Sequence, residues 1–232
     1  MNKPLFEILT FIDMHNITLI FTRHKENGCC NSIELHEIIK SISPEIIFEE
    51  LSYLNYQKCY IENSLITLET LAIKRYLHSH NIEHIPVDTF ALPQSYDDDI
   101  DYMYDRIFNN FAIAECHMLR NLLDKQSSLE FQYGFEFLNS NQNNELFSEI
   151  NSLKEAILTI LNSDRLFRIS KLEKEVLEKR ENEIIDNICN YSKEHQYSQA
   201  IQFIGAGHRE SIMKKIERYN SPEKLKWIFY SV

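Results

Sequence analysis

The run ITLIFT, residues 17–22, decides the fold of this 232-residue chain. β-Branched and aromatic residues fill most of the run, and its length is typical of a buried β-strand. Arg23 and His24 follow it directly. The sequence therefore predicts a buried strand with polar, chemically active side chains at its carboxyl end.

Four further runs have the same character and are predicted as strands: residues 46–49, 83–87, 200–204 and 226–231. Between them lie segments with apolar residues at helical spacing, predicted as helices that follow a cap-like Asn31, that span about 65–80 and that follow the fourth strand. A short amphipathic helix is expected at about 3–14. This alternation is typical of an α/β fold, so we expect a mostly parallel central sheet of about five strands flanked by helices.

The middle of the chain contains no convincing strand between residues 95 and 195. Its apolar residues recur at three- and four-residue steps, as in a predicted helix over 103–123, and a polar loop is expected at 139–144. We therefore expect one domain. Its core comprises 1–94 and 196–232, and a large all-helical insertion lies between the third and fourth strands.

Composition excludes several classes of protein. Hydrophobic residues make up 44% of the chain and charged residues 25%, which is enough apolar material for a folded core. The balance of 24 Lys and Arg against 35 Asp and Glu gives a net charge of −11, which argues against nucleic-acid binding through phosphate neutralisation. No apolar run has the length of a membrane span or a signal peptide, so we expect a cytoplasmic protein without membrane association. A homo-oligomer remains open.

Two local clusters allow more than one interpretation. The acidic run at 97–101 could bind a cation or begin a helix, where carboxylates complement the helix dipole. Five cysteines without a C-x-x-C pair disfavour a disulfide framework and a zinc ribbon. The adjacent Cys29 and Cys30 lie near His24, which leaves a redox or metal role open beside the usual role of a buried apolar residue.

The predicted strand ends nominate a site, because ligands of open α/β sheets bind at the carboxyl ends of the strands. The polar residues there are Thr22, Arg23, His24, Glu49, Glu50, Asp88 and His208. Histidine and carboxylate together suit a divalent transition metal such as Zn²⁺, Mn²⁺ or Co²⁺. Each residue alone has a simpler interpretation: His24 as a loop histidine, Glu50 as an exposed charge or cap, and Asp88 as a turn former.

Two of the chain's four glycines occur in the run GAGH, residues 205–208. A dinucleotide-binding turn would need a small residue at position 210, where a glutamate stands, and no P-loop occurs in the chain. We therefore expect no nucleotide. A close backbone approach at Gly205 and Gly207 that directs His208 into the site explains the glycines better.

A charged pair interrupts the apolar stripe of the helix predicted at about 169–191. Arg180 and Glu181 stand where the stripe should continue. A charge on the buried face of a helix is costly unless it meets a partner. The pair is either a buried structural ion pair or a sign that Arg180 reaches the site.

These motifs, in this order, resemble the TraB/Tiki (TraB/GumN) superfamily, which is related to the erythromycin-esterase/ChaN-like fold. Thr22-Arg23-His24 and the later PEIIFEEL, residues 44–51, resemble its opening motifs, and the run at 205–208 matches its closing Gly-x-x-His. Asp88 resembles its third-strand aspartate, and Arg180-Glu181 resembles its Arg-Asp step. Phe21 replaces the glycine of the first motif, and Thr89 stands where arginine is common.

The resemblance implies metal-dependent hydrolysis, most plausibly of a peptide, by a metal-activated water. His24 and His208 would be metal ligands or catalytic groups, Glu50 a ligand or general base, and Arg180, with Glu181 beside it, a group that stabilises negative charge. The further site candidates are Thr22, Arg23, Glu49, Asp88, Gly205, Gly207 and Arg209. The metal would be Mn, Co or Zn, and the substrate a peptide or small molecule. The alternative is a catalytically inactive interaction or regulatory protein of the same fold.

Overall fold

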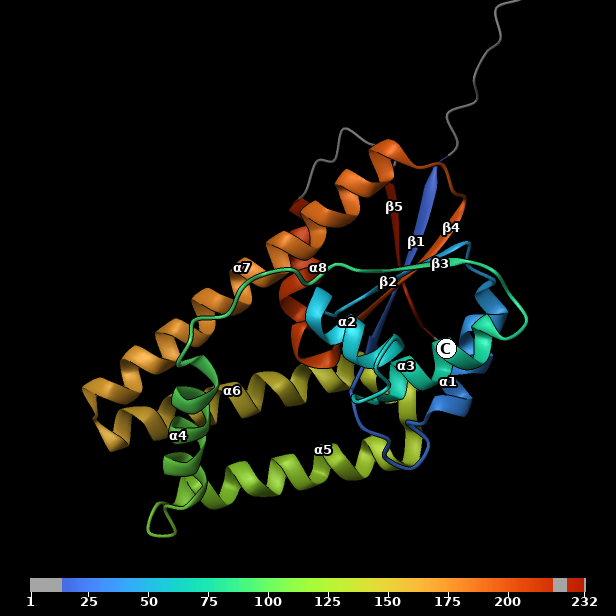
Figure 1. Ribbon diagram of the computed structural model, residues 1–232. Coiled ribbons are helices and arrows are strands. Elements are labelled where there is room, and N and C mark those ends of the chain that lie inside the picture. Colours follow the sequence, from blue (N-terminus) through green and yellow to red (C-terminus); the bar gives the residue numbers. More distant parts are fainter. Residues whose placement is uncertain (1–13, 219–224, 232) are drawn as a thin grey trace, which may run out of the picture.

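The computed structural model describes residues 14–218 and 225–231, and it has the predicted α/β fold (Figure 1). Five parallel strands form one sheet in the order β3-β2-β4-β1-β5. Their bounds are β1 His15–Thr22, β2 Ile46–Glu49, β3 Glu83–Pro86, β4 Gln199–Gly205 and β5 Leu225–Phe229. All five predicted strands are thus confirmed, and each predicted end lies within two residues of the observed end. The helix predicted at about 3–14 falls almost wholly outside the described residues.

The strands read correctly from sequence because the central ones are buried on both faces. Phe21, Phe48 and Phe203, from β1, β2 and β4, are buried at the centre of the core. Parallel sheets covered on both sides select continuous apolar runs rather than alternating ones. The register sets Phe21 beside Ile204 and Thr22 beside Gly205, so β1 and β4 end at the same level.

Four helices cover the sheet: α1 Ser32–Ile42, α2 Tyr53–Tyr60, α3 Leu68–Leu77 and α8 Arg209–Arg218. Asn31 caps α1 as predicted, and its side chain accepts hydrogen bonds from the N–H groups of Ile33 and Glu34. The helix predicted over 65–80 begins three residues later, after a capping box formed by Thr67 and Thr70. The sequence reading missed α2, because its mostly polar and aromatic residues do not form a clear apolar stripe.

The strand order creates a switch point between β1 and β4. The chain leaves β1 toward β2 and leaves β4 toward β5, which are opposite directions along the sheet. Right-handed crossovers then place α1 on one face and α8 on the other, as Figure 1 shows. The loops after two such neighbouring strands diverge, and the space between them is the usual ligand site of an open α/β sheet.

The insertion between β3 and β4 consists of four helices: α4 Tyr96–Phe108, α5 Ala114–Leu138, α6 Asn141–Leu161 and α7 Asp164–Glu194. They pack on one another and extend away from the sheet, and α7 returns to it (Figure 1). The acidic run forms the first turn of α4, in agreement with the helix-start interpretation.

Two predictions inside the insertion were wrong. The helix expected over 103–123 is broken between Phe108 and Ala114, and Phe111 lies in the break with 68% of its surface exposed. The loop expected at 139–144 is mostly the first turn of α6. Ser140 caps this helix, and Asn143 is buried, where its side chain donates to the carbonyl of Leu138. Hydrogen bonding of a buried amide thus explains Asn143, whereas Asn141 and Gln142 are exposed on the first turn of the helix.

Two glycines attach the loop after β1 to α5. Gly134 bends α5 with a positive φ of 54°, and a Cβ on it would lie 2.6 Å from the carbonyl oxygen of Cys29. A Cβ on Gly28 would lie 2.3 Å from the carbonyl oxygen of Phe131. The N–H of Cys29 donates to that same oxygen at 2.9 Å. Only glycine permits this contact between two backbones, so both positions have a structural role.

Candidate functional site

Glu50 is the centre of the polar network at the carboxyl ends of the strands. It follows β2, and its side chain is buried. Its Oε2 accepts the backbone N–H of Gly205 at 2.6 Å, and its Oε1 lies 2.9 Å from Nη2 of Arg180 and 3.3 Å from Nε2 of His208. Burial alone would raise its pKa, but His208, Arg180 and the Gly205 N–H lower it to about 2. Glu50 is therefore ionised throughout the physiological range.

Arg180 joins Glu50 to Asp88. α7 carries Arg180 to the sheet edge, where Nε lies 3.3 and 3.1 Å from the two carboxylate oxygens of Asp88 and Nη2 lies 2.5 Å from Oδ2. The side chain is 21% exposed, and Nη1 makes no hydrogen bond with a described residue. Both interpretations of the charged pair on α7 thus apply: Arg180 is in a largely buried ion pair and also reaches the predicted site.

His208 is held between two carboxylates. Its Nδ1 donates to Oε1 of Glu181 at 2.8 Å, and its Nε2 faces Glu50. Ser211 donates to the other oxygen of Glu181 at 2.6 Å. Burial lowers the pKa of His208, but the two carboxylates outweigh this and raise it to about 9. The imidazole is therefore a buried cation at neutral pH, with both nitrogens engaged.

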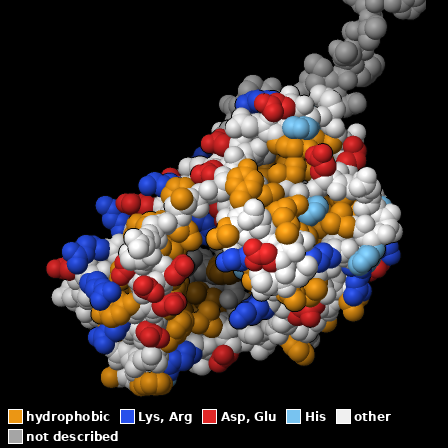
Figure 2. All heavy atoms as spheres, in the orientation of Figure 1, with side chains coloured by type: hydrophobic (Ala, Val, Ile, Leu, Met, Phe, Trp, Pro, Cys, Tyr) orange, Lys and Arg blue, Asp and Glu red, His pale blue; other side chains and the backbone are white. Residues whose placement is uncertain are grey.

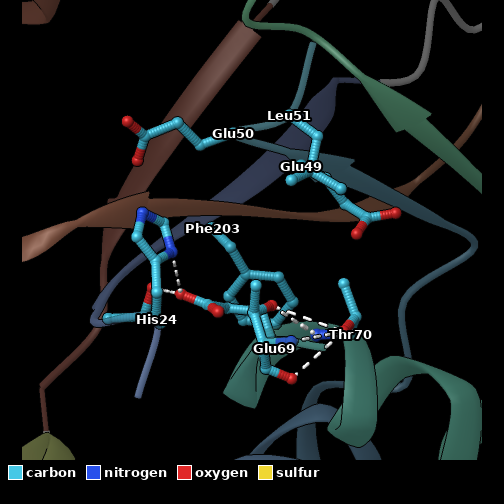
Figure 3. Close-up of a pocket in the computed structure, with 9 residues that line it drawn as sticks. His24, Glu49, Glu50, Leu51, Glu69, Thr70 and Phe203 are labelled. Atoms are coloured by element: carbon cyan, nitrogen blue, oxygen red, sulfur yellow. Dashed lines mark hydrogen bonds and ion pairs between the residues drawn. The ribbon is translucent and has the colours of Figure 1, made fainter. Parts of the chain in front are cut away.

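His24 lies in a different environment, although it follows the neighbouring strand. Its side chain is 58% exposed, and Nδ1 lies 3.3 Å from Oε1 of Glu69, a buried residue in the first turn of α3 (Figure 3). Thr22 donates to the same carboxylate oxygen at 2.8 Å. The hydrogen bond to Glu69 raises the pKa of His24 despite partial burial. One ring nitrogen is thus held by a carboxylate while much of the ring is open to solvent.

Sequence reasoning missed Glu69. It lies on α3, 45 positions after His24, and only the folded chain brings the two together. One signal was present: Glu69 falls among Leu68, Thr70 and Ala72 on the buried side of the helix start. A carboxylate in that position needs a polar partner, as Arg180 did.

Glu49 and Glu50 point apart, as consecutive residues at a strand end do (Figure 3). Glu49 accepts from Tyr60 at 2.6 Å and lies 2.8 Å from Nδ1 of His84. Burial raises its pKa. Between Glu49, Glu69 and His24 lies an enclosed cavity of about 10 Å³, about enough for one water molecule. Glu49 thus belongs to a second buried network and not to the Glu50 network.

The Glu50 network opens onto a cleft of about 310 Å³. Four predicted site residues line it: His24, Glu50, Asp88 and Arg180. Its other walls are largely apolar and include Leu51, Leu65, Phe90 and Leu92. The structure therefore brings predicted strand-end residues of β1, β2 and β3 to one concave surface, and its remaining lining also includes Ser52, Asn55 and Thr67.

The remaining candidates have separate roles. A Cβ on Gly205 would lie 3.4 Å from Glu50, in agreement with a close backbone approach there, whereas a Cβ on Gly207 would meet nothing within 4 Å. The explanation proposed for both glycines is therefore wrong for Gly207. Arg23 pairs with Glu130 of α5. Arg209 is buried, donates to the carbonyl of Asn139 at 2.9 Å and is not part of the Glu50 network.

The three predicted metal ligands do not converge in this arrangement. Glu50 and His208 adjoin, but Arg180 also binds the Glu50 oxygen that faces His208, and His24 pairs with Glu69 instead. Within residues 14–218 and 225–231, no group of three or more His, Cys, Asp or Glu side chains is placed to hold a metal ion. The arrangement fits a proton-bridged ion-pair network better than a three-ligand metal site, and the metal stays a prediction.

Cys30 is fully buried, and burial raises the pKa of its thiol, whereas Cys29 is exposed. Cys30 thus has the environment of a buried apolar residue.

No family model matches the chain, and no match was found to a curated protein or to a solved structure. The TraB/Tiki resemblance therefore stands on the motifs alone. Across the described part of the chain, no helix combines the length and apolar character needed to cross a membrane.

Proposed function

We propose that the chain is a hydrolase of the TraB/Tiki type, with peptide hydrolysis as its reaction, and that its reacting centre is the cleft between His24 and Arg180. One observation carries the proposal. A partly exposed histidine, held at Nδ1 by a buried carboxylate, lines the same cleft as an arginine that retains a free N–H donor. A histidine oriented by a carboxylate is the usual general base of hydrolytic enzymes.

In this mechanism, His24 in its neutral form removes a proton from water through Nε2, and the water oxygen bonds to the carbonyl carbon. Negative charge then develops on the carbonyl oxygen, where the free Nη1 of Arg180 can donate a hydrogen bond. The C–N bond breaks as His24 returns the proton to the departing amine. Glu69 holds the His24 ring, and Asp88 and Glu50 hold the guanidinium. No step requires a metal ion.

The test is hydrolysis of a fluorogenic peptide library by wild-type protein, followed by kinetics of His24→Gln and Arg180→Lys on the best substrate. We expect each substitution to lower kcat/KM by about 10²-fold or more. A matched control is His117→Gln, which changes an exposed histidine at the far end of the insertion. Turnover that survives His24→Gln unchanged would falsify the general-base role.

The metal-dependent form of the reaction makes a different prediction. Protein stripped with chelator and reloaded with Mn²⁺, Co²⁺ or Zn²⁺ should then regain activity with bound metal in stoichiometric amount, and His208→Ala should lose both. Activity that is the same before and after chelation, with no bound metal, supports the His24–Glu69 mechanism instead.

A catalytically inactive interaction or regulatory protein is the second candidate. The observation that favours it is that every carboxylate of the network has a cationic partner: Asp88, Glu50 and Glu181 are each paired with Arg180 or His208. Such closed networks also occur as purely structural features. Absence of turnover across peptide, ester and amide libraries, together with an unchanged fold in His24→Gln, would favour this candidate.

A further inference from the structure

Besides the small cavity next to Glu69, His24 lines two larger cavities. On one side is the cleft that contains Arg180, with Leu65, Phe90 and Leu92 in its walls. On the other side is a cavity of about 490 Å³ between the loop after β1, the turn after β4 and the insertion, lined in part by Arg23, His24, Lys25, Glu130 and Gly205–Gly207. A group bound at His24 therefore has space on both sides of it.

The two cavities differ in chemistry. Beyond the polar network, the first is lined by leucine and phenylalanine side chains together with Ser52, Asn55 and Thr67. In the second, Arg23 is already paired with Glu130, whereas Lys25 is exposed and has no ion-pair partner among the described residues. Figure 2 shows the surface hollowed between the insertion and the α2 region, with hydrophobic, basic and acidic side chains around the hollow. In a chain with a net charge of −11, an unpaired lysine in a cavity is a local attraction for an anion.

Arg209 adds a positive charge two residues after Gly207, which lines this second cavity. It is buried and begins α8 directly after the Gly205–His208 turn. Its Nε and Nη1 are buried without a hydrogen-bond partner, and no described carboxylate forms an ion pair with it. The open space around Gly207 leaves the turn accessible to a ligand.

We infer that the substrate has an apolar acyl group on one side of the scissile bond and a carboxylate on the other. An N-acyl amino acid fits this description, as does a short peptide whose penultimate residue is apolar. This inference rests on the proposed hydrolase. The acyl group occupies the Leu65–Phe90–Leu92 side, which places its carbonyl near Arg180. The leaving amino acid passes His24, and its carboxylate reaches Lys25. Water adds to the acyl carbon, the C–N bond breaks, and the products are the carboxylic acid of the acyl group and a free amino acid.

The experiment compares three probes: N-hexanoyl-alanine, its C-terminal amide and N-acetyl-alanine. We expect wild-type protein to prefer the first over each of the others by about tenfold in kcat/KM, because a hydrogen bond to a charged group or a buried four-carbon segment contributes that much or more. Lys25→Ala should raise KM for N-hexanoyl-alanine and leave the amide unchanged. Leu92→Ala should raise KM for the hexanoyl substrates and leave N-acetyl-alanine unchanged. Lys171→Ala, an exposed lysine of α7, is the control.

Binding of an inert analogue separates this inference from the proposed function. In the ketomethylene analogue of N-hexanoyl-alanine, a methylene group replaces the amide nitrogen, so it cannot be hydrolysed in the same way. Calorimetric binding that requires Lys25, in a protein that hydrolyses nothing, would support the two-sided site and overturn the hydrolase. Hydrolysis that requires His24 but is equal for acid and amide, and insensitive to Lys25→Ala, would overturn the two-sided site and leave the hydrolase standing.

Discussion

The two histidines at the ends of β1 and β4 have the same residue type and opposite environments. His24 is mostly exposed and has one carboxylate partner, Glu69, whereas His208 is buried between Glu50 and Glu181. The two carboxylates outweigh the effect of burial and keep His208 a cation of the framework at neutral pH. His24 retains an accessible ring, and its hydrogen bond to Glu69 raises its pKa. Neighbouring positions of one sheet edge thus provide a structural ion and a titratable base.

The largest effect on stability should come from removing Glu50, the carboxylate that faces both His208 and Arg180. Glu50→Ala leaves Arg180 and His208 with one carboxylate partner each in a buried site, and loss of one member of such a network typically costs about 3–5 kcal/mol. Urea unfolding followed by circular dichroism measures this. Glu37→Ala, at an exposed position on α1, should leave the free energy of unfolding nearly unchanged. A Glu50 variant as stable as the control would show that the network does not contribute to the free energy of unfolding.

The pH dependence of stability should identify His208 as a cation. Its pKa is raised from 6.5 to about 9 on folding, so the stabilisation is complete below pH 6.5 and disappears as the pH rises toward 9. The linked free energy is on the order of 3 kcal/mol. Urea midpoints at pH 6, 7, 8 and 9 measure the decline, and His208→Gln should remove this part of it. A wild-type profile that is flat over this range contradicts a charged His208.

Glu69→Gln should change kcat/KM and its pH dependence rather than the stability of the fold. The glutamine can still hold the His24 ring but no longer carries the charge that raises the pKa of His24. Because the neutral form of His24 is the base, wild-type kcat/KM should rise with pH through a value above 6.5. In the variant, that midpoint should move to lower pH and the plateau should fall, by about tenfold. An unchanged midpoint would mean that another group sets the profile.

The smallest effect should be that of His24→Gln on stability. The side chain is 58% exposed and its one ion pair is weak in water, so the free energy of unfolding should change by less than about 0.5 kcal/mol. The same variant is expected to lose hydrolysis. A stable but inactive His24 variant, together with a destabilised His208 variant, would show that His24 acts in catalysis and His208 in stabilising the fold. Equal destabilisation of the two variants would contradict this distinction.

The sequence predicted the sheet well because buried parallel strands are continuous apolar runs, and Arg180 was found because a charge interrupts an apolar stripe. The break between α4 and α5 was missed because Phe111 and Met118 continue a helical spacing although both are largely exposed. Glu69 was missed because its partner is distant in sequence. Patterns within one element can be read directly, whereas a contact between α3 and the loop after β1 depends on the packing of the whole core.

The backbone contacts of Gly28 and Gly134 have a mechanical consequence. They fasten the loop that contains His24 to α5, and the Arg23–Glu130 pair adds a third attachment next to His24 itself. α5 belongs to the helical insertion, packs on α6 and reaches far from the sheet. A molecule that displaces the insertion therefore also displaces the ring of His24, so binding at the insertion can change the position of the proposed base.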